Sequence, residues 1–168
     1  GPVVGTVMSN LGLEQKLQAE GVEFLRAKVG DRYVLAMLKE HGGVLGGETS
    51  GHLLCLDRTT TGAGLVSALE VLAVMKRTGR PLAELVAGMP KFPQVMINVR
   101  VRERIDPSQS QVIQDAVRRV EKVLGSTGRV VLRASGTEPV IRVMIEAEDE
   151  AVASRYASEL AEVVRTAI

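Results

Sequence analysis

The chain has 168 residues, of which 45% are apolar and only 2% aromatic, and its 21 basic side chains nearly balance 20 acidic ones. This balance and the scarcity of aromatic rings argue against a nucleic-acid-binding surface, and no apolar run approaches the roughly 18 residues of a membrane span. A single cysteine, Cys55 in the apolar run 53–56, excludes an internal disulfide. It predicts a small core residue in a reducing, cytoplasmic protein.

The first half of the chain alternates short apolar runs with helical patterns. It begins directly on a strand-like run over 3–8, so we expect a piece of a longer protein. The alternation favours an α/β layer with a mostly parallel sheet. The expected elements are a helix over 11–20 capped by Ser9 or Asn10, extended chain over 22–29, a helix from an Asp31 cap to Gly42, extended chain over 44–56, and a helix over 64–76.

The pattern changes at Pro90 and Pro93, where two prolines within four residues mark a candidate domain boundary. We therefore expect a mixed α/β sheet domain over 1–90 and a small α+β domain over 91–168. The second domain should form an antiparallel or mixed sheet with both helices on one face. Its expected elements are strands over 95–102, 129–133 and 140–147, a helix from 106 to 124, and a helix from about 150 that packs through Val152, Tyr156, Leu160 and Val163.

The run Arg-Ala-Ser-Gly-Thr-Glu-Pro over 133–139 precedes a strand that carries Arg142. Backbone N–H groups in a tight glycine turn can converge on an anion. The guanidinium groups of Arg133 and Arg142 add bidentate donors suited to phosphate oxygens. The alternative is a hairpin turn with surface arginines.

A second run, Gly-Gly-Glu-Thr-Ser-Gly-His over 46–52, lies just before an apolar strand. If this run is extended, Glu48, Ser50 and His52 project from the same side. An acceptor, a hydroxyl and an imidazole suit a polyhydroxylated ligand, and His52 can exchange protons near neutral pH. The alternative is a local pair of Glu48 and His52 beside a turn.

Together the two runs resemble known loops of the α-D-phosphohexomutases. Residues 47–52 resemble the sugar-binding loop of that family, and residues 133–143 resemble its C-terminal phosphate-binding loop. Their spacing suits the third and fourth domains of the family's four-domain chain, the third only in part. Residues 8–13 and 27–34 look like the family branch that acts on glucosamine phosphates, rather than the branches for mannose or glucose phosphates.

The resemblance implies a mutase that interconverts glucosamine 6-phosphate and glucosamine 1-phosphate, for synthesis of UDP-N-acetylglucosamine and cell wall. It implies a phosphoserine, a bisphosphorylated intermediate and Mg²⁺ held by an Asp-rich loop. Neither the phosphoserine loop nor the Asp-rich loop occurs in this sequence, so no metal ligand is expected here and the chain alone is expected to be inactive. The implied partners are the glucosamine phosphate substrate and the missing N-terminal domains, and the piece is expected to self-associate.

The resemblance also implies roles for single residues. Glu48 and Ser50 would contact the sugar hydroxyls, and His52 would lie near the reacting oxygen and take part in proton transfer. Lys28 matches a basic position close to the site, with an ordinary surface lysine as the alternative. The residues expected to clamp the phosphate that is not transferred are Arg133, Ser135, Gly136, Thr137 and Arg142.

Three alternatives stay open: a phosphomannomutase or phosphoglucomutase, a stand-alone phosphosugar-binding module, and a structural domain whose arginine-rich turn only packs. One position departs from the family pattern. Ala63 stands where we expect an acidic residue that would cap the following helix, so the start of that helix is expected to be weaker.

Overall fold

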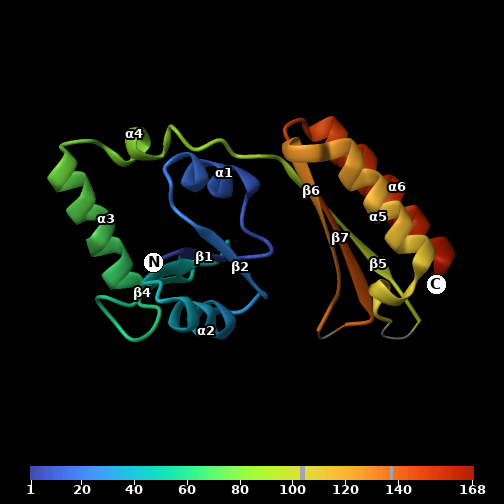
Figure 1. The fold of residues 1–168 in the computed structure, drawn as a ribbon, viewed down its shortest axis with the longest axis horizontal. Coiled ribbons are helices and arrows are strands. Elements are labelled where there is room, and N and C mark those ends of the chain that lie inside the picture. The colour runs from blue at the N-terminus through green and yellow to red at the C-terminus, as the bar shows by residue number, and fades with distance from the viewer. Residues whose placement is uncertain (103–104, 137) are drawn as a thin grey trace. The chain divides into compact units, whose positions relative to one another are not determined.

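The computed structural model describes residues 1–102, 105–136 and 138–168, and the chain forms two compact units, Gly1–Lys91 and Phe92–Ile168 (Figure 1). Thr137, one of the residues predicted to clamp phosphate, lies outside the described residues. In the described part of the chain, no helix has the length and apolar character needed to cross a membrane.

The first unit contains a four-stranded sheet in the order β2-β1-β3-β4. Strand β1 runs parallel to both β2 and β3, whereas β3 and β4 pair antiparallel. The mixed α/β sheet predicted from the alternating pattern is therefore confirmed, and the one antiparallel pair is a hairpin. The strands are β1 (Val3–Thr6), β2 (Phe24–Ala27), β3 (Leu45–Gly47) and β4 (Leu53–Cys55).

The helices of the first unit start in different ways. The Asn10 side chain accepts a hydrogen bond from the Gly12 N–H at 3.1 Å and caps the first helix, as predicted. The predicted cap at Asp31 is wrong, because Gly30 is the N-cap and Asp31 is the first helical residue. Gly30 has φ +127°, which side-chain-bearing residues rarely adopt. The helices are α1 (Leu11–Ala19), α2 (Asp31–His41), α3 (Gly64–Thr78) and α4 (Leu82–Val86).

Helices α2 and α3 differ in how they pack. Val34 and Leu38 of α2 are buried against Val4 of the inner strand β1. In contrast, none of the α3 residues, all of which the structure describes, is buried. An apolar hollow of about 440 Å³ lies between α3 and the β3–β4 hairpin. Its lining is mostly aliphatic and includes Leu45 and Leu53 of the hairpin.

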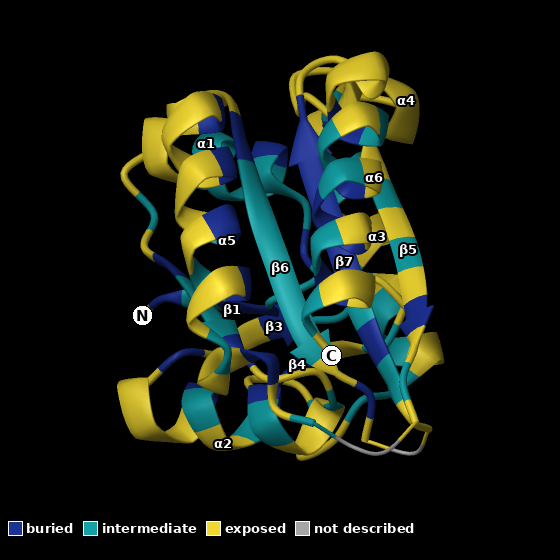
Figure 2. Cartoon of the chain, turned by 90° about the vertical axis from the view of Figure 1, so that its right-hand side faces the viewer, coloured by how far each residue is buried: buried dark blue, intermediate teal, exposed yellow. Residues whose placement is uncertain are grey.

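The second unit is a three-stranded antiparallel sheet in the order β5-β7-β6, with two long helices on one face, as predicted (Figure 1). The central strand β7 is mostly buried, whereas the helices expose their outer faces (Figure 2). The elements are β5 (Gln94–Arg100), α5 (Gln111–Leu124), β6 (Gly128–Ala134), β7 (Val140–Ala147) and α6 (Glu150–Ala167), with short 3₁₀ turns at Pro107–Gln109 and Gly125–Thr127.

The predicted apolar face of α6 is wrong in part. Val152 is exposed, whereas Leu160 is buried as expected. Tyr156 and Val163 are half-buried and pack against the same core, so of the predicted face only Val152 is wrong. The buried residues of α6 are Ala153, Ala157, Leu160, Ala161 and Val164.

Candidate functional site

The predicted sugar-binding residues come together at one edge of the first sheet. Strands β1, β2 and β3 are parallel, so their carboxyl ends meet at the same edge, where ligands bind in open α/β sheets. Lys28 directly follows β2, and Glu48 directly follows β3. His52 precedes β4, which runs the other way and therefore starts at this edge. Lys28 is exposed there.

The loop between β3 and β4 is not extended, so the expectation that alternate side chains project from one side of it is wrong. The Glu48 N–H donates to the His52 carbonyl at 2.9 Å, and the Gly51 N–H donates to the Glu48 carbonyl at 3.0 Å. Gly51 has φ +93°. These bonds close a hairpin turn, which the antiparallel pairing of β3 and β4 requires, and Ser50 is exposed in it.

The Glu48 side chain ties this hairpin to the start of α2. Its Oε1 atom accepts a hydrogen bond from the Gly30 N–H at 2.8 Å. A carboxylate at this place also lies favourably near the positive end of the helix dipole. The local Glu48–His52 side-chain pair, which was the alternative from sequence, is not the contact seen, because each side chain binds a different residue at the start of α2.

The His52 imidazole is held on two sides. Its Nδ1 atom lies 3.6 Å from Asp31 Oδ2, and the side chain is 40% exposed. The opposite edge of the ring lies against Gly62, where an added Cβ would come within 1.9 Å of Nε2. Only glycine at position 62 leaves room for this ring position.

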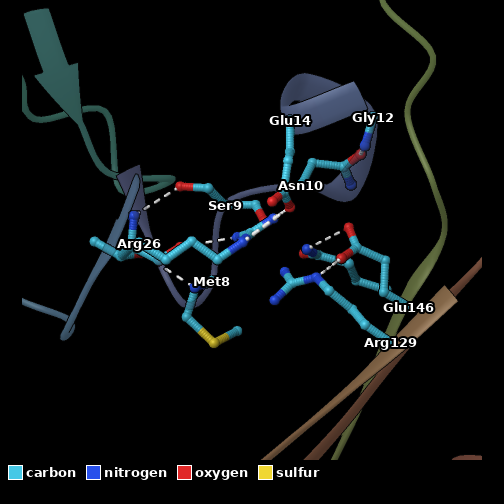
Figure 3. A network of polar contacts seen from close by, with 10 residues as sticks. Met8, Ser9, Asn10, Gly12, Glu14, Arg26, Arg129 and Glu146 are labelled. Carbon is cyan, nitrogen blue, oxygen red and sulfur yellow. Dashed lines mark hydrogen bonds and ion pairs between the residues drawn. The ribbon is translucent and has the colours of Figure 1, made fainter. Parts of the chain in front are cut away.

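A residue with no role in the sequence analysis, Arg26 of β2, braces the same edge (Figure 3). Its Nη1 donates to the carbonyls of Thr6 at 3.0 Å and Ser9 at 2.7 Å. Its Nε and Nη2 donate to Glu14 Oε2 at 3.1 and 2.7 Å. Arg26 therefore links the end of β1 to α1, and the signal for it was a lone guanidinium within the strand-like run 24–27.

The second candidate site lies on the antiparallel sheet of the other unit, where Arg133 and Arg142 are direct register partners. The buried Nε atom of each arginine has no hydrogen-bond partner among the residues that the structure describes. Burial and then the charge of Arg142 lower the pKa of the Arg133 guanidinium. Like charges placed opposite each other are destabilising, and buried donors without acceptors are rare, so this pair is suited to binding an anion.

The described residues on either side of position 137 are joined to the sheet. The buried residue Ser135 follows β6, and its N–H donates to the Val140 carbonyl at 2.8 Å. Gly136 is exposed beside it. Glu138 approaches Arg142 only at 3.8 Å, a distance at which it leaves most of the guanidinium donors available.

Arg129 lies on the same strand as Arg133 but has a structural role, because it binds a buried carboxylate. Its Nε atom donates to the carboxylate of Glu146, which is fully buried and also accepts from Gln94 Nε2 at 2.9 Å (Figure 3). No local sequence pattern indicates this contact. The contrast matters because Arg129 has a carboxylate partner within the unit, whereas Arg133 faces a second arginine.

Within the described residues, no cluster of histidine, cysteine, aspartate and glutamate side chains could hold a metal ion. The side chains that the structure describes therefore do not fit a magnesium site. Cys55 is buried, and burial, followed by the charges of Asp57 and Glu70, raises the pKa of its thiol. A protonated, buried thiol is the core residue that the sequence predicts.

Comparison with known protein families matches both units. Residues 1–92 match the model described as phosphoglucomutase/phosphomannomutase, alpha/beta/alpha domain III, and residues 96–163 match its C-terminal domain. Over 99% of this chain, the phosphoglucosamine mutases of Alkalilimnicola ehrlichii and Methylococcus capsulatus are 58% and 55% identical to it. The chain spans only 37% of the length of each of these relatives.

Solved structures share the fold at low sequence identity. One is Aspergillus fumigatus N-acetylphosphoglucosamine mutase in complex with GlcNAc-6P and magnesium, with a TM-score of 0.81, 19% identity, and coverage of 97% of this chain and 41% of that one. Another is a phosphoglucomutase/phosphomannomutase family protein from Burkholderia thailandensis, with a TM-score of 0.74, 24% identity, and coverage of 99% of this chain and 37% of that one.

Proposed function

We propose a function from one premise: this chain belongs to the phosphoglucomutase/phosphomannomutase family. We infer that it is the carboxyl-terminal part of a phosphoglucosamine mutase, which interconverts glucosamine 6-phosphate and glucosamine 1-phosphate. The observation that carries the proposal is the pair Arg133 and Arg142, two half-buried guanidiniums opposite each other with unpartnered Nε donors among the described residues. Such a pair is suited to one phosphate group.

The second unit would hold the phosphate that is not being transferred. Arg133 and Arg142 supply the charged donors, and Ser135, Gly136 and Thr137 supply a hydroxyl, a backbone N–H and a second hydroxyl. Fixing this phosphate orients the rest of the sugar, so that the other phosphate-bearing position meets the reacting group of the whole protein. This is a positional contribution to the rate, as phosphoryl transfer requires.

The first unit would recognise the sugar itself. Glu48 keeps its second carboxylate oxygen as an acceptor for a sugar hydroxyl while the first binds Gly30. Ser50 adds a hydroxyl from the exposed hairpin turn. His52 would take or give a proton at the reacting oxygen, and the Lys28 ammonium would balance the moving phosphoryl charge.

The remaining parts of the chemistry are proposed for the rest of the protein. A phosphoserine would donate the phosphoryl group and receive one back from the bisphosphorylated intermediate, and Mg²⁺ would stabilise charge on the transferring group. This chain alone is therefore expected to lack turnover and to bind substrate weakly. We place the whole protein in the cytoplasm, on the route to UDP-N-acetylglucosamine.

The test is the substrate preference of the intact protein, with glucosamine 1-phosphate, glucose 1-phosphate and mannose 1-phosphate compared by kcat/KM. We expect glucosamine 1-phosphate to give the highest value. Faster turnover of mannose 1-phosphate or glucose 1-phosphate would assign the protein to a sibling branch. Absence of turnover with all three, together with phosphosugar binding, would favour a binding module.

A further inference from the structure

We propose that Asp31 is a positioning residue for His52: its carboxylate faces Nδ1 of the imidazole and favours the tautomer with the proton on Nδ1, which leaves Nε2 as the acceptor. This inference rests on the proposed function, in which His52 exchanges a proton with the substrate. It adds a residue outside the two resembling loops, on the first turn of α2.

The Asp31 carboxylate lies close to the His52 imidazole. Asp31 Oδ2 lies 3.6 Å from His52 Nδ1, just beyond an ordinary hydrogen bond, and side chains of both residues are partly exposed. The other oxygen, Oδ1, accepts from the Arg32 N–H at 2.7 Å. This second bond fixes the carboxylate at the start of the helix, so that Oδ2 is the oxygen that faces the imidazole.

The backbone at Gly62 restricts the position of the His52 ring. Gly62 lies against the Nε2–Cδ2 edge of His52, where an added Cβ would come within 1.9 Å of Nε2 and 2.2 Å of Cδ2. The ring is therefore limited on the side opposite Asp31. The tautomer of a histidine is set by the hydrogen bond that its other nitrogen makes, so a carboxylate at Nδ1 leaves Nε2 as the acceptor.

The surrounding charges agree with this assignment. Glu48, which begins the hairpin that carries His52, directs one carboxylate oxygen to the Gly30 N–H. Arg32, the other charged residue beside Asp31, directs its guanidinium to the Tyr33 hydroxyl at 2.5 Å. Asp31 is thus the carboxylate that approaches the imidazole among the described residues.

The chain offers a direct test because it has only two histidines, His41 and His52. We would record the nitrogen and carbon NMR shifts of both imidazoles in the 168-residue chain, roughly two pH units above the ordinary histidine pKa of about 6.5, where the neutral tautomers are distinguished. We expect His52 to be mainly the Nδ1–H tautomer. The exposed His41 at the end of α2 should be mainly Nε2–H, as in free imidazole side chains.

The variant Asp31→Ser keeps a short polar residue at the start of α2 but cannot reach Nδ1. We expect His52 to lose its Nδ1–H preference in this variant and to resemble His41. The matched control, Glu40→Ser, removes a carboxylate from the far end of the same helix and should leave His52 unchanged. An Nε2–H tautomer of His52 in the unsubstituted chain would overturn the proposal even if Asp31→Ser failed to fold. An unchanged tautomer in a folded Asp31→Ser chain would also overturn it.

In the intact protein, Asp31→Ser should lower kcat about tenfold and leave KM within about twofold, because an oriented proton acceptor acts in the transition state. Unchanged kcat would overturn the positioning role in the reaction. Failure of the proposed function would look different: the unsubstituted intact protein would show no mutase turnover, while the tautomers of His52 would still follow Asp31.

Discussion

The two candidate sites differ in whether their polar atoms already have partners. In the first unit, Glu48 binds the Gly30 N–H and His52 faces Asp31, so the hairpin is held by its own contacts. In the second unit, Arg133 and Arg142 face each other, and their Nε atoms have no partner within the described residues. This difference supports the proposal that the hairpin orients the substrate and that the arginine pair supplies most of the attraction for its anionic group.

The largest expected effect is on stability, and it distinguishes Arg129, which binds Glu146, from Arg133, which faces Arg142. Arg129→Ala would remove an arginine that binds the buried carboxylate of Glu146, and removing one partner of a buried ion pair costs about 3 kcal/mol or more of unfolding free energy. Urea unfolding measures this. Arg133→Ala is the matched control on the same strand and should cost far less, because Arg133 faces another cation. Equal losses for the two variants would remove the distinction between Arg129 as a structural residue and Arg133 as a site residue.

The second effect concerns binding rather than stability. Arg133→Ala combined with Arg142→Ala should weaken the affinity of the intact protein for glucosamine 6-phosphate about 100-fold, because two charge-assisted donors are lost. A titration with the bound sugar detected by NMR gives the dissociation constants. Arg119→Ala, which removes an exposed arginine paired with Glu159, serves as the control and should leave affinity unchanged. Unchanged affinity in the double variant would favour the reading that the turn only packs.

A smaller effect is expected beside the hairpin. Ala63 is the N-cap of α3, has extended backbone angles and makes no side-chain cap bond. Ala63→Asp should add about 1 kcal/mol of unfolding free energy, because its carboxylate can accept from the free N–H groups of the first turn. Ala63→Val is the control, because valine adds no carboxylate and is as poor an N-cap as alanine. Since Ala63 follows Gly62, which supports His52, the variant should keep the His52 tautomer while it stabilises α3.

The smallest effect is a pH dependence that belongs to the first unit. Burial raises the pKa of the Cys55 thiol above 9.0, so the folded state keeps this proton at pH values where the unfolded state releases it. The resulting stability is present below pH 9.0 and is lost as pH rises through the raised pKa. Urea unfolding between pH 8 and roughly pH 11 should therefore show a steeper loss for the unsubstituted chain than for Cys55→Val. Parallel curves would contradict this assignment.

The sequence predicted most elements because apolar periodicity and glycine or proline boundaries are local signals. It predicted the two loops for the same reason, since their residue types lie within a few positions of one another. It did not predict the hairpin form of the loop 48–52, because antiparallel pairing of β3 with β4 depends on the whole sheet. The contacts of Asp31 with His52 and of Glu48 with Gly30 join segments distant in sequence, and no local pattern encodes them.

The central claim is that Arg133 and Arg142 form one anion site, and their own Nε–H groups report on it most directly. We would follow the arginine Nε–H signals of the 168-residue chain by NMR during addition of glucosamine 6-phosphate. Glucosamine, which lacks the phosphate group, is the control. We expect the signals of Arg133 and Arg142 to move together with one dissociation constant, while that of Arg129 stays in place. Movement of neither signal, or equal movement with glucosamine alone, would contradict it.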